Sequence, residues 1–381
     1  MKNQKRYTRV QKYKFQGQWA AIVGVGNIGG ELCRQLAPLG FNLILFDNGL
    51  VEIENLGNQG FFEQDLGKSK VLARAEMLRK INSGVHVLPV HANITALGAG
   101  LFNKTRLIFS CLDSWYTRNI VNSIAQKLNI PMIDSGISNS GESYGRITLL
   151  DMRKTNSPCL FCSWDQRQVT AVRQKENERK NSCMKLKLGA KEVNADPTIQ
   201  PGFTGSLVAG IAVAKGIELL RKQKTSIPSQ EILIDITHHI FKSYRLERNK
   251  ECLYPHQKWP VKIVGKTEHI SVLQLFDIAA SDLDSAEINL NLFKKNIVTD
   301  ITCENNHHQK NVFRILETFP DSFKKCSCGA EFEATQMDVL NSFDLESAEP
   351  FKEKTFEQLG LPKRDIVTAS NGKRKIHYII L

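Results

Sequence analysis

Residues 19–30 read Trp-Ala-Ala-Ile-Val-Gly-Val-Gly-Asn-Ile-Gly-Gly, and this stretch decides the fold. Its first five residues form an apolar run typical of a buried strand, and a helical pattern extends over 28–39. Gly24, Gly26 and Gly29 form a Gly-x-Gly-x-x-Gly loop between the two. Such a loop opens a helix whose backbone N–H groups and dipole stabilise phosphate, so we expect a nucleotide here.

Working outward, strands and helices alternate along the chain. The next apolar run ends at Asp47, the position from which a carboxylate binds ribose hydroxyls in this architecture. We expect further helices at 68–81, 115–128 and 207–220, and strands at 43–46, 85–90, 107–111, 131–134, 144–150, 231–236 and 240–246. The pattern predicts an α/β fold with a doubly wound, Rossmann-like and mainly parallel sheet.

Two other stretches indicate the domain organisation. Residues 165–201 are polar with little periodicity, and we interpret them as a crossover loop, because connections of this length are usually functional. A segment containing Pro and Trp follows Cys252 and is the expected boundary. We therefore predict a nucleotide-binding domain over 1–260 and a smaller α+β domain over 261–381, to which we assign partner recruitment.

Composition excludes several classes of protein. The chain has 381 residues, 41% of them hydrophobic, which excludes disorder and a disulfide-stapled miniprotein. The 207–220 helix is shorter than the roughly twenty residues of a membrane span. Residues 1–9 lack an apolar signal core and nine cysteines is an odd number, so we expect reduced thiols in the cytoplasm and no membrane. The net charge of +12 is spread along the chain, so we do not expect nucleic acid as a partner.

The residues after Asp47 do not fit a simple dehydrogenase, and they carry a resemblance. The matching residues are Arg6-Tyr-Thr-Arg9, Asp47, Asn55-Leu56, Gln59, Gly67, Lys70 and Cys111-Leu-Asp113 with Arg118. Over roughly residues 5–256 the chain resembles the ThiF/MoeB-type adenylyltransferases, which are related to the ubiquitin activators. Where that family commonly reads Asn-Leu-x-Arg-Gln, this chain has Asn58 in place of the arginine. Arg74, one helical turn beyond Lys70, is a possible substitute.

The resemblance implies ATP, Mg²⁺ and a set of site residues. It assigns nucleotide binding to Gly24, Gly26, Gly29, Asp47, Asn55, Asn58, Gln59, Lys70 and Asp113. Lys70 would be the catalytic lysine and Asp113 the magnesium ligand, which suits a reaction in which a carboxylate approaches a phosphate. Arg9 would reach the ATP of a neighbouring subunit, which implies a homodimer. The alternatives are a solvated Lys70, Asp113 as a helix N-cap, and a merely basic terminus at Arg9.

Cysteine and histidine residues form two candidate zinc sites. Cys159 and Cys162 form a Cys-x-x-Cys, and Cys252 and His256 can complete a Cys₃His set. The resemblance supports this site, although relatives close it with a final cysteine, and an uninvolved His256 is the alternative. The second candidate site consists of Cys303, His307 or His308, Cys326 and Cys328, whose Cys-x-Cys spacing is atypical.

Cys183 is a candidate nucleophile. Ubiquitin activators pass their carrier to a cysteine near the nucleotide site, and Cys183 lies in the expected crossover loop beside Lys180 and Lys185. Positive charge nearby lowers a thiol pKa. Cys33 and Cys111 lie in expected core elements and are interpreted as packing residues. Some relatives adenylate without a thioester, so an incidental thiol at position 183 is the equal alternative.

These observations predict an enzyme that adenylates the C-terminal carboxylate of a ubiquitin-like or sulfur-carrier protein, a partner with a C-terminal glycine tail. A thioester on Cys183 and a conjugating enzyme would follow in a conjugation pathway, which we favour slightly over sulfur transfer. The chain ends in Tyr378-Ile-Ile-Leu381, so we expect that it is not the carrier itself. The alternatives are sulfur-carrier activation without a thioester, an NAD-dependent oxidoreductase and a nucleic-acid-binding module.

Overall fold

The computed structural model describes residues 15–137, 144–180, 201–221, 228–252, 254, 256–303, 305–319, 325–330 and 332–381, except for the side chains of 176–180 and 332–336. These residues form two compact units. The first contains described residues 15–94, 104–166 and 201–257, and the second contains 95–103, 167–180 and 258–381. Residues 95–103, which lie inside the range expected for the first domain, thus group with the second unit.

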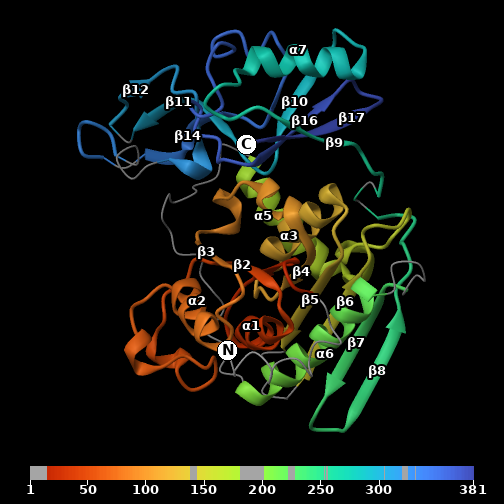
Figure 1. Ribbon diagram of the computed structural model, residues 1–381. Helices are drawn as coiled ribbons and strands as arrows, with labels where there is room; N and C mark the ends of the chain where they lie inside the picture. The colour runs from red at the N-terminus through yellow and green to blue at the C-terminus, as the bar shows by residue number, and fades with distance from the viewer. Residues whose placement is uncertain are drawn as a thin grey trace. The chain divides into compact units, whose positions relative to one another are not determined.

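An eight-stranded sheet organises the first unit, in the order β3-β2-β1-β4-β5-β6-β7-β8 (Figure 1). The strands from β3 to β5 run parallel, whereas β6, β7 and β8 continue the sheet antiparallel. The predicted doubly wound, mainly parallel sheet is therefore confirmed. The strands are β1 (Trp19–Val23), β2 (Asn42–Asp47), β3 (Val87–His91), β4 (Thr105–Ser110), β5 (Met132–Ile137), β6 (Tyr144–Leu150), β7 (Gln230–Asp235) and β8 (Ile240–Arg245).

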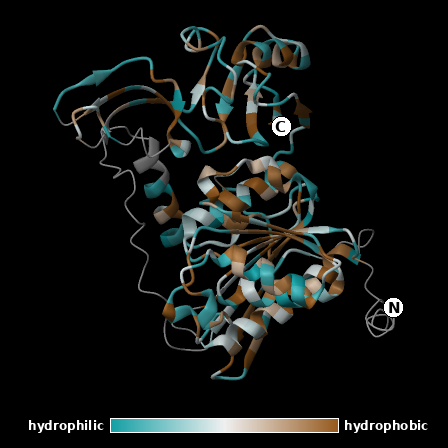
Figure 2. Ribbon diagram, turned by 60° about the vertical axis from the view of Figure 1, so that its left-hand side comes forward, coloured by the Kyte–Doolittle hydropathy of each residue, from teal (hydrophilic) through white to brown (hydrophobic). Residues whose placement is uncertain are grey.

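Helices cover both faces of this sheet, and Figure 2 shows the apolar strands with helices above and below them. They are α1 (Asn27–Leu36), α2 (Lys70–Ile81), α3 (Trp115–Leu128), the short α4 (Leu160–Ser163) and α6 (Gly202–Arg221). In α1 the buried Ile28, Leu32 and Leu36 are spaced by four and form one apolar stripe. This stripe packs against α6 and against the strand positions of one sheet face, which include Ala20 and Ile22.

Two helices differ from the sequence prediction. Residues 166–180, interpreted as part of a crossover loop, form helix α5 (Gln166–Lys180). Its sequence is rich in Gln, Arg, Lys and Glu, which favour helix intrinsically but form no apolar stripe, so periodicity could not reveal it. Helix α6 is also longer than the predicted helix over 207–220, because residues 202–206 before it are helical as well.

Of the helices that the structure describes, α6 is the one long and apolar enough to cross a membrane, judged by length and composition. In this structure it packs on the sheet: Val208, Ala209 and Ala212 are fully buried with Leu107 and Phe109 of β4 in the same cluster. Burial between the sheet and α1 accounts for its apolar sequence.

The second unit contains two smaller sheets and one more helix. A five-stranded sheet has the order β15-β10-β16-β17-β9, and in the other sheet β11 pairs with β12, β13 and β14. Helix α7 (Val272–Leu283) packs on the first of these sheets, and its N-cap Ser271 forms a capping box with Gln274. The strands are β9 (Val261–Val264), β10 (Asn289–Leu292), β11 (Ile297–Cys303), β12 (His308–Gln309), β13 (Arg314–Ile315), β14 (Phe332–Leu340), β15 (Ser342–Phe343), β16 (Asp365–Ser370) and β17 (Lys375–Ile380).

A buried ion pair explains why residues 95–103 group with this unit. Lys295 Nζ lies 2.7 Å from Asp365 Oδ2, and both side chains are at most 1% exposed. Lys295 also donates to the carbonyl of Leu97, and Asp365 accepts from the backbone N–H of Ala99. These two hydrogen bonds attach the segment to buried charged groups of the second unit.

Candidate functional site

The site residues predicted in the first unit gather at the carboxyl ends of neighbouring strands. Strand β1 pairs with β2 on one side and with β4 on the other, so the chain order reverses there. Open α/β sheets bind ligands outside the carboxyl ends of the strands at such a switch point. The glycine loop follows β1, Asp47 ends β2, and Asp113 follows β4.

The glycine loop packs directly against the chain that leads to Asp113. Gly24 has φ +86°, and a Cβ there would lie 2.5 Å from the carbonyl oxygen of Cys111. Cys111 N–H in turn donates to Val23 O at 2.8 Å. Gly26 caps α1 without a side-chain hydrogen bond, and the first turn of α1 contains no acidic residue. This helix start is therefore chemically suited to an anion.

Gly29→Ala should disrupt this loop. A Cβ at Gly29 would lie 1.8 Å from the carbonyl oxygen of Gly24, so the helix and the loop would have to separate. We expect the variant to lose roughly 1–3 kcal/mol of unfolding free energy and to bind nucleotide weakly. Gly57→Ala is the matched control, because a Cβ there meets nothing within 4 Å. Equal effects of the two substitutions, measured by thermal unfolding and ATP titration, would contradict the close-approach argument.

Asp47 and Lys70 lie side by side. Asp47 accepts from Val25 N–H at 2.9 Å through Oδ2 and from Gly49 N–H at 2.8 Å through Oδ1, so its carboxylate orders the glycine loop. A Cβ at Gly49 would lie 3.0 Å from Asp47 Oδ1 and 3.4 Å from both Cδ and Cε of Lys70. Lys70 begins α2, is half-buried, and its backbone N–H donates to Gly49 O. The structure thus brings the predicted lysine to the predicted acid.

The predicted site residues between Asp47 and Lys70 have two different roles. Asn55 is buried and its Oδ1 accepts from Glu52 N–H, so this side chain builds a local turn. Asn58 Oδ1 and Gln59 Oε1 are buried and have no hydrogen-bond partner in the described part of the chain. The Gln59 amide lies beside the glycine loop, since a Cβ at Gly26 would be 3.4 Å from its oxygen. A buried amide that is left unpaired indicates a place for a polar ligand.

Arg74 does not replace the missing arginine. Its guanidinium donates to the carbonyl oxygens of Val25, Gln59 and Gly60, and it lies 3.9 Å from the centre of the Phe61 ring. The side chain is 3% exposed, and burial lowers its pKa. The earlier suggestion is therefore wrong: Arg74 fastens the 59–61 segment to the glycine loop, and its donors are already used. Sequence spacing placed Arg74 near Lys70 but could not reveal the carbonyls that surround it.

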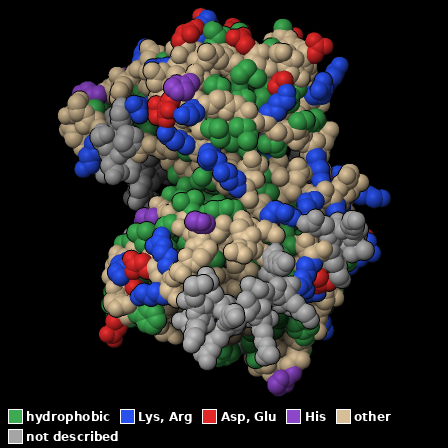
Figure 3. Space-filling model, in the orientation of Figure 1, with side chains coloured by type: hydrophobic (Ala, Val, Ile, Leu, Met, Phe, Trp, Pro, Cys, Tyr) green, Lys and Arg blue, Asp and Glu red, His purple; other side chains and the backbone are tan. Residues whose placement is uncertain are grey.

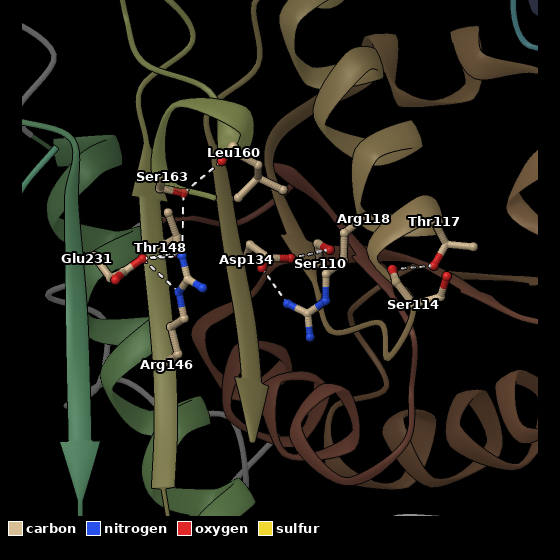
Figure 4. A network of polar contacts seen from close by, with 10 residues as sticks. All are labelled: Ser110, Ser114, Thr117, Arg118, Asp134, Arg146, Thr148, Leu160, Ser163 and Glu231. Carbon is tan, nitrogen blue, oxygen red and sulfur yellow. Dashed lines mark hydrogen bonds and ion pairs between the residues drawn. The ribbon is translucent and has the colours of Figure 1, made fainter. Parts of the chain in front are cut away.

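Asp113 is exposed and free of a capping role. The N-cap of α3 is Ser114, so the alternative interpretation of Asp113 as an N-cap is wrong. Just below it, Ser110 Oγ donates to Asp134 Oδ1 at 2.7 Å, and Arg118 pairs with Asp134 Oδ2 (Figure 4). This buried network, which the sequence did not reveal, joins the end of β4 to β5 and to α3. It fixes the point at which the Asp113 loop leaves the sheet.

Figure 4 also shows a second network on the neighbouring strands β6 and β7. Arg146 forms an ion pair with Glu231, and its guanidinium also lies 3.5 Å from Ser163 Oγ. The pair therefore ties the strands to α4 immediately after Cys162.

The four predicted ligands of the first zinc site converge. The Cys159 Sγ lies 4.0 Å from that of Cys162, 3.7 Å from that of Cys252 and 3.8 Å from His256 Nε2. Two thiolates bound tetrahedrally to one zinc lie about 3.8 Å apart. His256 Nδ1 lies 2.7 Å from Ser157 O, which orients Nε2 toward the sulfurs. Hydrogen bonds with Cys159 and Cys252 lower the pKa of the Cys162 thiol, whereas hydrogen bonds with Cys162 and Cys252 raise the pKa of Cys159. The set fits a closed tetrahedral ion.

The ligands of the second predicted cluster also come together. Ligand atoms of Cys303, His307, Cys326 and Cys328 all lie within 4.8 Å of one another. Of the two histidines left open by the sequence, His307 is the one in the cluster. His308 instead lies 3.3 Å from Thr302 Oγ1 through Nδ1.

Four residues singled out in the sequence remain: three cysteines and one arginine. Cys33 is fully buried, and burial raises its pKa to about 12, which confirms a packing role. Burial raises the pKa of Cys111 as well. Arg9 and Cys183 lie outside the described residues.

The comparisons identify the class of protein that this fold and site define. The profile of the ThiF family matches residues 8–254, and the chain belongs to this family. Ubiquitin-like modifier-activating enzyme 5 of Drosophila ananassae is 28% identical over 193 residues, 47% of this chain and 48% of that protein. SUMO-activating enzyme subunit 2 of Dictyostelium discoideum is 30% identical over 145 residues, 37% of this chain and 21% of that protein. The chain thus spans about half, or less, of the length of these curated relatives.

A solved structure shares the fold. Microcin C7 biosynthetic enzyme MccB, in complex with N-formylated MccA, superposes with a TM-score of 0.50 and 22% identity, over 66% of this chain and 75% of that one.

Proposed function

We propose that this chain uses Mg-ATP to adenylate the C-terminal carboxylate of a small ubiquitin-like or sulfur-carrier protein. The observation that carries the proposal is the gathering of the glycine loop, the adjacent Asp47 and Lys70, and the Asp113 loop at one switch point. Family membership and the names of the activating-enzyme relatives support it.

The chemistry explains why these groups are needed. A carboxylate oxygen of the carrier attacks the α-phosphorus of ATP, the bond to pyrophosphate breaks, and an acyl-adenylate forms. Lys70 neutralises phosphate oxygens as the two anions meet. Asp113 has the hard oxygen ligands that suit Mg²⁺, and an ion held there would supply further positive charge. The unpaired amide oxygens of Asn58 and Gln59 would accept hydrogen bonds from donor groups of the bound nucleotide.

Three further roles belong to the same proposal. The Cys183 thiolate would attack the acyl carbon, forming a thioester as AMP leaves, and a conjugating enzyme would accept the carrier. The alternative is activation of a sulfur carrier without this step. Arg9 would reach the ATP of a second copy in a homodimer. Zinc on Cys159, Cys162, Cys252 and His256 would hold α4 against the chain after β8, in a structural role.

Nucleotide preference separates this proposal from its main alternative. A nicotinamide-dependent oxidoreductase would need only the glycine loop and Asp47, and it leaves the placement of Lys70 unexplained. We expect Mg-ATP at about 100 times its Kd to stabilise the full chain by about 2.7 kcal/mol, with a much smaller effect of NAD⁺. Thermal unfolding with each nucleotide checks this. A larger stabilisation by NAD⁺ would favour the oxidoreductase.

Nucleic-acid binding has less support. On the face drawn in Figure 3, Lys and Arg side chains lie scattered among acidic and apolar ones and form no continuous stripe. On this face the positive charge is therefore not concentrated as an electrostatic footprint on nucleic acid would be.

A further inference from the structure

The second Cys/His cluster lies in the β11–β14 sheet, which the proposed adenylation does not use. Cys303 ends β11, His307 lies in the turn before β12, and Cys326 and Cys328 lie in the turn that precedes β14. Both turns are tight: Cys303 N–H donates to His307 O at 3.0 Å, and Cys326 N–H donates to Ala330 O at 2.8 Å. Two separate hairpin turns therefore present their ligands to one point.

The spacing fits a single tetrahedral ion. The sulfurs of Cys303 and Cys328 are 3.8 Å apart, and Cys326 Sγ is 3.7 Å from His307 Nδ1. Zinc bound at ordinary lengths separates two thiolates by about 3.8 Å and a thiolate from an imidazole nitrogen by about 3.6 Å. Four protein ligands leave no open position, which is the arrangement of a structural and not a catalytic zinc.

Polar groups lie next to the ligands of this cluster. Cys328 accepts a hydrogen bond from Asn305 Nδ2 at 3.5 Å. Deprotonated sulfur is the form that binds zinc, and both this contact and Lys325, the residue before Cys326, favour it.

The apolar cluster beside the four ligands is small, because Ile297 of β11 and Ile315 of β13 pack into the larger cluster under α7 instead. Its buried residues in the described part of the chain are Val298, Ile301, Cys303, Phe319 and Met337. By contrast, the cluster under α7 contains more than four times as many buried residues. The part of the sheet around the ligands therefore has little apolar burial of its own, a setting in which a metal or a disulfide commonly supplies stability.

We propose that Cys303, His307, Cys326 and Cys328 bind one Zn²⁺, which fastens the β11–β12 hairpin to the turn before β14 and stabilises this sheet. A disulfide is the competing way to join the same turns. The Cys303 and Cys328 sulfurs are 3.8 Å apart, well beyond the bonded length of about 2.05 Å. A disulfide between these two sulfurs would also not account for His307 and Cys326, which lie in the same cluster.

The metal content of the full chain tests the proposal. We expect the Cys326→Ser/Cys328→Ser variant to contain one zinc per chain fewer than the wild type by mass spectrometry of the metal. His307→Ala should bind zinc more weakly against a chelator. His308→Ala is the matched control, because His308 is exposed like His307 but lies outside the cluster. This variant should keep the zinc content of the wild type. The Cys159→Ser/Cys162→Ser variant measures separately the zinc bound by the first cluster.

A second measurement uses the wild-type chain and does not depend on a variant folding. Cys326 and Cys328 should react slowly with iodoacetamide, and a zinc chelator should accelerate their alkylation at least tenfold by peptide mass spectrometry. Alkylation that is fast from the outset, or that needs a reductant and not a chelator, would overturn the proposal. So would an unchanged zinc content in the Cys326/Cys328 variant.

Discussion

Lys70→Ala should slow ATP–pyrophosphate exchange by about 10²- to 10³-fold, the loss typical of removing one preorganised charge from a transition state. Lys70 is the half-buried first residue of α2, and its side chain runs past Gly49 beside the Asp47 carboxylate. In the proposed reaction this placement, at the carboxyl edge of β2, would bring the ammonium to the phosphates held by the glycine loop. Because the reaction joins two anions, the substitution should lower the exchange rate more than it weakens ATP binding.

The matched control for Lys70 is Lys80→Ala. Lys80 is exposed and lies near the other end of α2, so its substitution removes the same charge from the same helix. We expect near wild-type exchange in Lys80→Ala. The melting temperatures of both variants should lie within a few degrees of that of the wild type. Comparable losses in both variants would mean that Lys70 acts only through the net charge.

Asp113→Asn should also slow ATP–pyrophosphate exchange, but here the loss should depend on the Mg²⁺ concentration. The carboxylate is exposed at the carboxyl end of β4, and the buried Ser110–Asp134–Arg118 network fixes the base of its loop. The amide keeps the shape but removes the charge that attracts Mg²⁺. We expect about 10²-fold slower exchange, partly restored by raising the Mg²⁺ concentration.

Ser114→Ala is the control for Asp113. Ser114 is the neighbouring N-cap of α3, and its side chain makes no capping hydrogen bond. Exchange by this variant should retain the wild-type dependence on Mg²⁺. A loss in Asp113→Asn that no concentration of Mg²⁺ alters would remove the metal-ligand role from the account.

The first half of the fold could be predicted because its elements carry strong local signals. The run from Trp19 to Val23 and the four-residue spacing in α1 are visible in the sequence, and the structure contains both elements. Helix α5 was missed because it is polar around nearly its whole circumference. Its stability comes from the intrinsic preference of its residues and the burial of Val172, neither of which produces a periodic pattern.

The candidate site could be predicted where a residue acts through its type and its spacing. Cys159, Cys162, Cys252 and His256 are such residues, and they converge. Arg74 and the pair of Lys295 with Asp365 could not be assigned in this way. Each is a charge whose role depends on carbonyls and carboxylates brought near it by distant parts of the chain. Sequence spacing carries no record of those contacts.

The most direct test of the account is ATP–pyrophosphate exchange by the full chain, with a panel of ubiquitin-like and sulfur-carrier proteins that end in Gly-Gly. At least one carrier should support exchange through its free C-terminal carboxylate. The same carrier with an amidated C-terminus should support none, because the attacking oxygen is gone. Exchange that is indifferent to amidation, or no exchange with any carrier by a chain that binds NAD⁺ tightly, would contradict the proposed reaction.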